Sequence, residues 1–353
     1  MGDGIAFPTT YSLTPNSLRK AQMLTFIIRR ILLAIVTMWA ITVLSFIIIQ
    51  LPPGDFVDAY IARLSASGSS VSAVEAQNLR LLYGLDEPYV VQYAKWMGRL
   101  VKGDFGESME WQRPVAEVLG DRLWMTVVLS FAALLLTWGL ALPIGIYSAV
   151  RQYSIGDYVI TTLGFIGLAV PNFLLALVIL YLSFRWFGAN VGGLFSAEME
   201  IAPWGWAKFA DLMWHLPLPA LILAVAGTAQ LIRIMRANLL DELRKPYVVT
   251  ARAKGLSEMH VILKYPVRAA LNPFASTLAY LFPYLVSGSI IISLVMSLPT
   301  VGPVLLSALI AQDMYLAGTI VLLLGALTVV GTFISDLVLM WIDPRIRHQV
   351  DQT

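Results

Sequence analysis

The sequence predicts an all-α, polytopic helical membrane protein with six transmembrane helices and an extracytoplasmic helical segment between the first two. Hydrophobic residues make up 58% of the 353 positions and charged residues only 13%, which is about half the charged share of soluble domains. The few charges leave long uncharged runs, and a membrane span needs roughly 20 apolar residues. The chain has no cysteine, so disulfides, thiolate metal sites and cysteine nucleophiles are excluded. The composition excludes an ordinary soluble enzyme, a disordered chain and a nucleic-acid-binding protein.

Six runs without Lys, Arg, Asp or Glu mark the predicted spans. The first run is too long to be the apolar part of a cleaved signal peptide, and it indicates a permanent first span at 23–50. The fifth run is about twice the length of a span, but prolines and a glycine at Leu298–Pro303 interrupt it. We therefore expect one span at about 273–297, then an external turn and a short helix. The runs are residues 31–54, 123–150, 158–184, 212–232, 269–312 and 314–335.

The positions of lysine and arginine predict the orientation. The loop at 233–268 holds eight basic residues against three acidic ones. With both termini on the side of this loop, 15 of the 24 basic residues share that side, and the positive-inside rule makes it cytoplasmic. A seven-span alternative would put Arg345 and Arg347 outside, which the charge distribution disfavours. The predicted parts are a cytoplasmic tail at 1–22, the first span, an extracytoplasmic segment at 51–122, a membrane core at 123–342 and a cytoplasmic tail at 343–353.

The extracytoplasmic segment is expected to form short amphipathic helices joined by turns. Turn-forming residues cluster at Leu51–Asp55, Ser65–Ser72 and Tyr83–Pro88, and proline, glycine and serine clusters of this kind separate helices. Leu79 and Leu82 repeat at helical spacing between two of these turns. The segment either caps the spans or offers a docking surface to a soluble partner, and the two roles are compatible.

The loop at about 237–268 carries a more specific local pattern. Pro246 suits the first turn of a helix and Gly255 suits the position just after its end, so a helix is predicted over Tyr247–Lys254, with a second helix after it. A short helix under a bilayer is held either by lipid headgroups or by another protein. The small side chains of Ala251 and Ala253 would allow a protein to approach closely. Composition alone favours the lipid-bound alternative.

The segment Thr250–Leu256 reads Thr-Ala-Arg-Ala-Lys-Gly-Leu and resembles the cytoplasmic loop of ABC importer permeases of the dipeptide and oligopeptide class. Other segments match the same family in the same order, over nearly all of the chain after about residue 23. The resemblance implies the type I ABC importer permease fold. The matching segments are Arg29–Leu32, Pro53–Asp55, Tyr83–Asp86, Gln92–Tyr93, Gly103–Ser108, Leu216–Pro219 and Asp343–Arg347.

The resemblance also implies a role and partners. The chain would be one permease of an ATP-driven, binding-protein-dependent importer in a prokaryotic cytoplasmic (inner) membrane. It would work with a second homologous permease, two ATP-binding cassette ATPase subunits and an extracytoplasmic substrate-binding protein, within the lipid bilayer and without nucleic acid. ATP and Mg²⁺ would be held by the ATPase subunits, because this sequence has no Gly-x-x-x-x-Gly-Lys-Ser/Thr phosphate loop. We therefore expect a non-catalytic chain without a metal site or a cofactor of its own.

In the family, this loop forms a coupling helix that docks into a cleft of the ATPase subunit. Four basic residues around it are expected to pair with acidic groups on the ATPase or with anionic lipid: Arg244, Lys245, Arg252 and Lys254. The ATPase is the favoured partner for Arg252 and Lys254. The residues matched to the coupling helix are Pro246, Tyr247, Thr250, Ala251, Arg252, Ala253, Lys254, Gly255, Leu256 and Ser257.

Two departures from the family pattern concern the substrate. Val249 stands where the general importer loop carries an acidic residue, and Ser297–Pro303 lacks the acid that is usual in the corresponding segment. Peptides are the first expected substrate. Oligosaccharides or glycosides, or a metal chelate, are alternatives that the same machinery could import.

Five polar residues are candidates to line the pathway: Asn172, Gln230, Ser287, Ser289 and Ser293. Pro171 and Pro283 can kink the helices that carry Asn172 and the three serines. Small and polar residues, however, can also serve helix packing alone. No charged residue lies in the middle of a predicted span, so the ion or proton relay of an ATP-independent secondary transporter is not indicated. The three histidines form no His-Glu-x-x-His motif, so a membrane metalloprotease is not supported.

Overall fold

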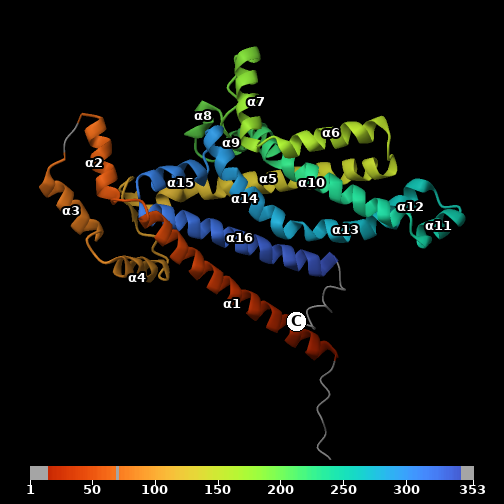
Figure 1. Ribbon diagram of the computed structural model, residues 1–353, viewed down its shortest axis with the longest axis horizontal. Helices are drawn as coiled ribbons and strands as arrows, with labels where there is room; N and C mark the ends of the chain where they lie inside the picture. Colours follow the sequence, from red (N-terminus) through yellow and green to blue (C-terminus); the bar gives the residue numbers. More distant parts are fainter. Residues whose placement is uncertain (1–14, 69–70, 343–353) are drawn as a thin grey trace, which may run out of the picture.

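The computed structural model describes residues 15–68 and 71–342, except for the side chains of residues 15–26, 273, 275, 278–279 and 338–342. The predicted tail at 343–353 and residues 1–14 of the other tail lie outside the described residues. Within the described part nearly all regular structure is helical (Figure 1). The predicted all-α class is confirmed.

Four long helical segments run along the molecule and form its body (Figure 1). They are α1 (Pro15–Gln50), α5 (Val115–Val150), α16 (Met314–Ile342), and α9 (Trp206–His215) with α10 (Pro217–Leu243). Each contains a stretch long and apolar enough to cross a membrane. α10 packs along α5, and α1 packs along α16. The first, second, fourth and sixth predicted spans therefore correspond to long apolar helices.

The third predicted span, 158–184, is not one straight helix. It consists of α6 (Ile155–Ala169) and α7 (Asn172–Phe187), which meet at 101°. Val170 is extended, with φ −88° and ψ 121°, because a residue before proline avoids the helical region. Pro171 also lacks the N–H that would continue the hydrogen-bond ladder. The expected kink at this proline is therefore a complete break, and α7 stands across the long helices in Figure 1.

The fifth predicted span, 273–297, falls on two consecutive helices, α13 (Pro266–Ser276) and α14 (Leu278–Val295). The apolar stretch of α14 is shorter than those of the four long segments. The expected turn follows, and then the expected short helix, α15 (Val301–Ile310). Pro283 lies inside α14 without ending it.

Three short helices form a lobe at one end of the molecule, here named the α2–α4 lobe (Figure 1). They are α2 (Phe56–Ala66), α3 (Ala73–Tyr83) and α4 (Tyr89–Leu100), as the turn pattern predicted. The α4 side chain Trp96 is fully buried and fixes this lobe to the body. A Cβ on Gly318 of α16 would lie 2.7 Å from its indole, so only glycine allows this close approach.

A small hairpin links the lobe to α5, and the sequence pattern did not predict it. Its strands are β1 (Glu107–Ser108) and β2 (Arg113–Pro114). The fully buried carboxylate of Asp313, next to the start of α16, accepts hydrogen bonds from Ser108 Oγ (2.6 Å) and the Glu110 N–H (3.1 Å). Burial raises the pKa of Asp313, and the hydrogen bonds oppose that rise. This carboxylate holds the hairpin against the end of a long helix.

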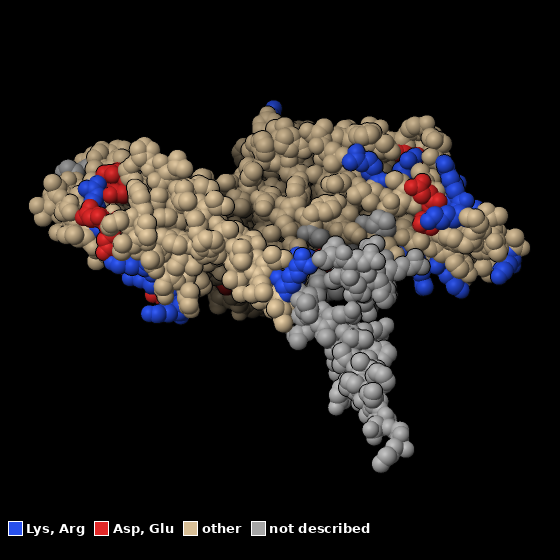
Figure 2. All heavy atoms as spheres, turned by 60° about the horizontal axis from the view of Figure 1, so that its bottom comes forward, with Lys and Arg blue, Asp and Glu red and all other residues tan. Residues whose placement is uncertain are grey.

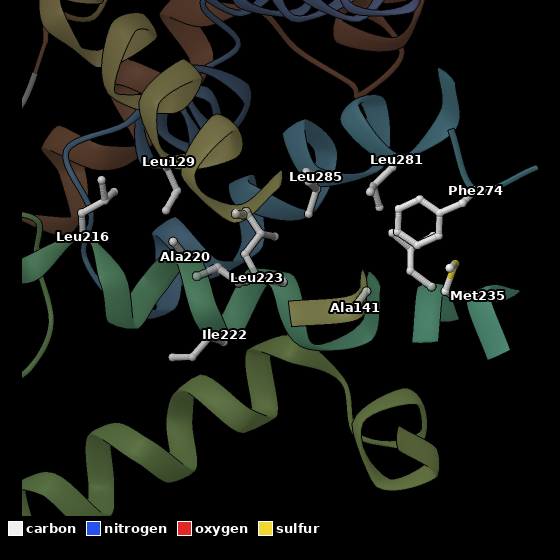
Figure 3. Close-up of a cluster of buried hydrophobic side chains, with 14 of the residues drawn as sticks. Leu129, Ala141, Leu216, Ala220, Ile222, Leu223, Met235, Phe274, Leu281 and Leu285 are labelled. Carbon is white, nitrogen blue, oxygen red and sulfur yellow. The ribbon is translucent and has the colours of Figure 1, made fainter. Parts of the chain in front are cut away.

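The main apolar core lies between α5, α10, α13 and α14 (Figure 3). Leu129 of α5, Leu223 of α10 and Leu285 of α14 are completely buried there and lie close together in Figure 3. Phe274 of α13 packs edge-on against Trp138 of α5, with ring centroids 4.9 Å apart. This core fixes α10 and α13, and the loop between them is the predicted coupling loop.

Candidate functional site

The predicted coupling helix is present as α11 (Pro246–Ala253), followed by α12 (Glu258–Lys264). Pro246 occupies its first turn, as expected. Gly255 has φ +76°, the left-handed conformation in which glycine ends a helix without strain. Ser257 precedes α12 with extended backbone. The two helices and the turn at Gly255 are here named the α11–α12 unit.

The inner face of the α11–α12 unit is a small apolar core. Val248, Ala251 and Val261 are buried there, and Tyr265 packs against them. Ala251 therefore faces α12, and its small side chain sets the spacing within the unit. Ala253 is exposed. Of the two alanines that were expected to let a protein approach closely, Ala253 is therefore the one on the surface.

Two ion pairs fix the unit further. Arg252 binds Glu258 through two contacts, Nη2–Oε1 at 2.5 Å and Nε–Oε2 at 3.0 Å. This contact raises the pKa of Arg252 and lowers that of Glu258. Lys245 Nζ lies 2.6 Å from an oxygen of Glu242 at the end of α10. Two of the four basic residues expected to pair with other molecules are thus already paired within this chain.

Tyr247 adds a contact between α11 and the end of α10. Its hydroxyl donates to Glu242 Oε2 at 2.5 Å. Partial burial and this hydrogen bond raise the pKa of Tyr247 to about 12, so the phenol stays protonated and continues to donate at neutral pH. The start of α11 is therefore tied to the span that precedes it.

The outer face of the α11–α12 unit exposes apolar side chains among polar and basic ones. Val249 is 59% exposed and Met259 is 68% exposed, and neighbouring Thr250 is also exposed. Lys254 is exposed too, and it has no acidic partner within the described part of the chain. Lys and Arg gather over this end in Figure 2. An exposed apolar face surrounded by cations is suited to contact another protein surface.

Sequence reasoning missed the residues of α12 that complete this surface. Glu258 begins the second helix and is the partner of Arg252 across the Gly255 turn, a contact that the sequence did not indicate. Val261 and Tyr265 supply the other half of the small core. Their spacing of four residues was a usable signal, because such residues share one face of a helix.

The five pathway candidates lie in different environments. The Asn172 amide donates to the Leu223 carbonyl at 3.4 Å, and Gln230 is half-buried on α10. Ser289 and Ser293 are buried on α14, whereas Ser287 is exposed. None of the five lines either of two cavities on the molecule, of about 630 and 290 Å³.

Long apolar helical segments, a broken helix beside them and an exposed helical loop at one end define a polytopic membrane protein. The chain belongs to the family of binding-protein-dependent transport system inner membrane components, which matches residues 141–348. The family that describes the N-terminal part of such membrane components matches residues 23–130. The resemblance drawn from the loop and the ordered segments is thereby confirmed, and the protein is integral to the inner membrane.

Similar proteins cover almost the whole chain. The oligopeptide transport system permease protein AppB of Bacillus subtilis is 34% identical over 330 residues, which are 92% of this chain and 100% of that protein. A putative peptide permease protein of Brucella ovis is 34% identical over 92% of this chain and 99% of its own length. The inner membrane ABC transporter permease protein YejB of Escherichia coli O157:H7 is 31% identical, again over 92% of this chain and 99% of that protein.

Proposed function

We propose that this chain is the permease subunit of an ATP-driven, binding-protein-dependent importer of peptides. The proposed substrate is supported by relatives of matching length, whose names describe oligopeptide or peptide permeases. The proposed partners are a second homologous permease, two ATPase subunits that hold ATP and Mg²⁺, and an extracytoplasmic binding protein. This chain contributes half of the pathway and no catalytic group.

In this proposal the basic end, with the α11–α12 unit, lies in the cytoplasm together with both termini. The α2–α4 lobe then lies on the opposite side of the membrane. The arrangement is supported by the excess of basic residues at 233–268, since basic loops are retained on the cytoplasmic side. It places the apolar outer face where an ATPase subunit can reach it.

The observation that carries the coupling role is the construction of the α11–α12 unit. Its inner face is packed and salt-bridged, so it can move as one body, while its outer face exposes Val249 and Met259. An ATPase that closes on ATP would pull this unit, and the ties from Lys245 and Tyr247 to Glu242 would pass the movement to α10. In this mechanism Arg252 stabilises the unit through its ion pair with Glu258. Lys254 is the cation that remains available to pair with the ATPase subunit.

Of the five candidates for the pathway lining, we retain the three whose side chains are not fully buried. Asn172, Gln230 and Ser287 are half-buried or exposed in the single chain. Ser289 donates to its own helix at Val286, which is a packing role. Asn172 lies just after the α6–α7 break, where the broken backbone would permit a polar lining.

The test uses Val249→Arg in the complete transporter, with Val74→Arg as its matched control. Arginine is chosen because an acid at position 249 would only restore the residue type that the general importer loop carries there. Both valines are well exposed, at 59% and 71%, so neither change disturbs a core, but Val74 lies in the α2–α4 lobe. We expect Val249→Arg to reduce the co-purified ATPase at least about tenfold, because a charge in a desolvated contact removes a central anchor. Transport per ATP hydrolysed should fall with it. Full ATPase recovery and coupling with Val249→Arg would refute the assignment.

A further inference from the structure

A narrow groove of about 290 Å³ lies between α6 and α10, which run side by side in Figure 1. Its α6 side is one helix face, from Asp157 through Thr161 to Leu168, spaced by four and seven residues as a single face requires. Small residues form its floor. A Cβ added at Gly164 would lie 3.9 Å from the Cβ of Ala229, so the two helices come close without filling the space between them.

The groove is charged at one end and apolar along the rest. Asp157, Arg233 and Arg236 line the charged end, while Phe165 and Leu168 line the other. From residue 157 to residue 168 a helix advances about 16 Å at 1.5 Å per residue. Half of a bilayer's hydrocarbon core is about 15 Å thick. The groove therefore has the length and polarity of one lipid chain with its headgroup.

The charged end has one positive charge left over. Arg236 is fully engaged by Asp157, with Nε–Oδ1 at 3.0 Å and Nη2–Oδ2 at 2.8 Å. Asp157 is buried and also accepts hydrogen bonds from Ser148 Oγ and the Tyr153 N–H. Arg233 is exposed one turn away, and among the side chains that the structure describes it has no acidic partner. An arginine of this kind is suited to a phosphate, which it can bind through two hydrogen bonds.

Aromatic side chains mark the same end as a membrane boundary. Tyr153 and Tyr158 line the groove beside the charges and are exposed. Tyrosines concentrate where the hydrocarbon core meets the headgroups. Basic pockets between membrane helices on the cytoplasmic side are established binding sites for anionic headgroups.

We propose that this groove binds one anionic phospholipid, with its phosphate on Arg233 and an acyl chain along Phe165 and Leu168. None of the five pathway candidates and no residue of the α11–α12 unit lines this groove. A lipid here would hold α6 against α10 just before the break at Pro171. Transport could then depend on the supply of anionic lipid without any change in the substrate site.

The experiment is native mass spectrometry of the intact transporter with dioleoylphosphatidylglycerol or dioleoylphosphatidylcholine as the added probe. We expect the parent to retain phosphatidylglycerol preferentially. Arg233→Gln should lower that retention about fivefold, as for the loss of one interfacial cation, and should leave phosphatidylcholine unaffected. The matched control is Arg268→Gln, because Arg268 is exposed on α13 and lies outside the groove. Equal retention by parent and Arg233→Gln would overturn the proposal.

A second pair of variants tests the apolar part of the groove. Gly164→Leu should fill it and displace phosphatidylglycerol while Arg233 stays in place, whereas Gly139→Leu should have no effect, because nothing lies within 4 Å of a Cβ there. Full retention with Gly164→Leu would overturn the proposed chain position. Displacement of the lipid by millimolar inorganic phosphate would show a free-phosphate site instead.

The chain has no cysteine, so Phe165→Cys introduces a single reactive thiol. Its cross-linking to the second permease would show that a protein covers the groove, and this too would overturn the lipid assignment. Labelling of Phe165→Cys by a membrane-soluble maleimide, blocked when phosphatidylglycerol is added, is the result expected.

Discussion

Replacing Asp313 by alanine should release the hairpin that joins the α2–α4 lobe to α5. The carboxylate is fully buried and accepts from Ser108 Oγ at 2.6 Å and from the N–H groups of Glu110 and Leu316 at 3.1 Å. The Leu316 N–H belongs to α16 itself, so only the donors of Ser108 and Glu110 join the hairpin to Asp313. These two donors would lose their acceptor at about 1 kcal/mol each, or about 2 kcal/mol in all. A change of that size is a factor of about 30 in the local opening equilibrium.

Hydrogen exchange of the Glu110 amide measures this opening directly. Exchange at Glu110 should accelerate by about thirtyfold in Asp313→Ala, while Asp86→Ala, a change at an exposed position in the same lobe, should have no such effect. Asp313→Asn should be the milder variant, because burial already disfavours the charge of this carboxyl and raises its pKa, and the amide keeps one acceptor. Unchanged exchange in Asp313→Ala, or an equal effect from Asp86→Ala, would contradict the proposed role of the carboxylate.

Other contacts give three further predictions. Val248→Ala removes two methyl groups from the buried face of α11 and should destabilise the α11–α12 unit by about 2 kcal/mol, measured as faster hydrogen exchange in α12. Arg252 lowers the pKa of Glu258, so this pair stabilises the unit above the unfolded pKa of about 4.3 and the stabilisation disappears as pH falls through the lowered value. Both side chains are about half exposed, so at most about 1 kcal/mol is involved, and Glu258→Gln should remove that pH dependence from α12 exchange. Asp157→Asn leaves Arg236 without a carboxylate and should cost about 3 kcal/mol, seen as a lower apparent Tm than for Asp86→Asn.

The long apolar helices and helix α11 could be predicted because their signals are local. A bilayer requires uninterrupted apolar stretches, so the charge-free runs identified α1, α5, α10 and α16 directly. Pro246 and Gly255 fixed the ends of α11 through their own backbone preferences, and the structure places both ends within one residue of the expected positions.

The remaining features depend on residues far apart in the chain. Ser108 and Asp313 are 205 positions apart, and no periodicity in either segment points to the other. The Pro171 break was expected as a kink, but its angle of 101° is set by how α6 and α7 pack, which a single proline does not determine. Arg252 was expected to pair with the ATPase. Its partner within the chain, Glu258, lies on a different helix beyond the Gly255 turn, and no local pattern joins the two residues. Local pattern thus specified where helices lie, whereas tertiary contacts decided how they are joined.

The charges that border the predicted spans bear on the energy source. Asp336 borders the sixth predicted span and pairs with Arg30 of α1, and Asp157 borders the third and pairs with Arg236 of α10. The first pair joins α16 to α1, and the second joins α6 to α10, so each pair has a structural role. A proton-driven transporter needs a carboxylate that is free to exchange its proton during the cycle, whereas each of these two carboxylates is held in an ion pair between helices. This favours an energy source outside the chain, applied through the exposed face of the α11–α12 unit.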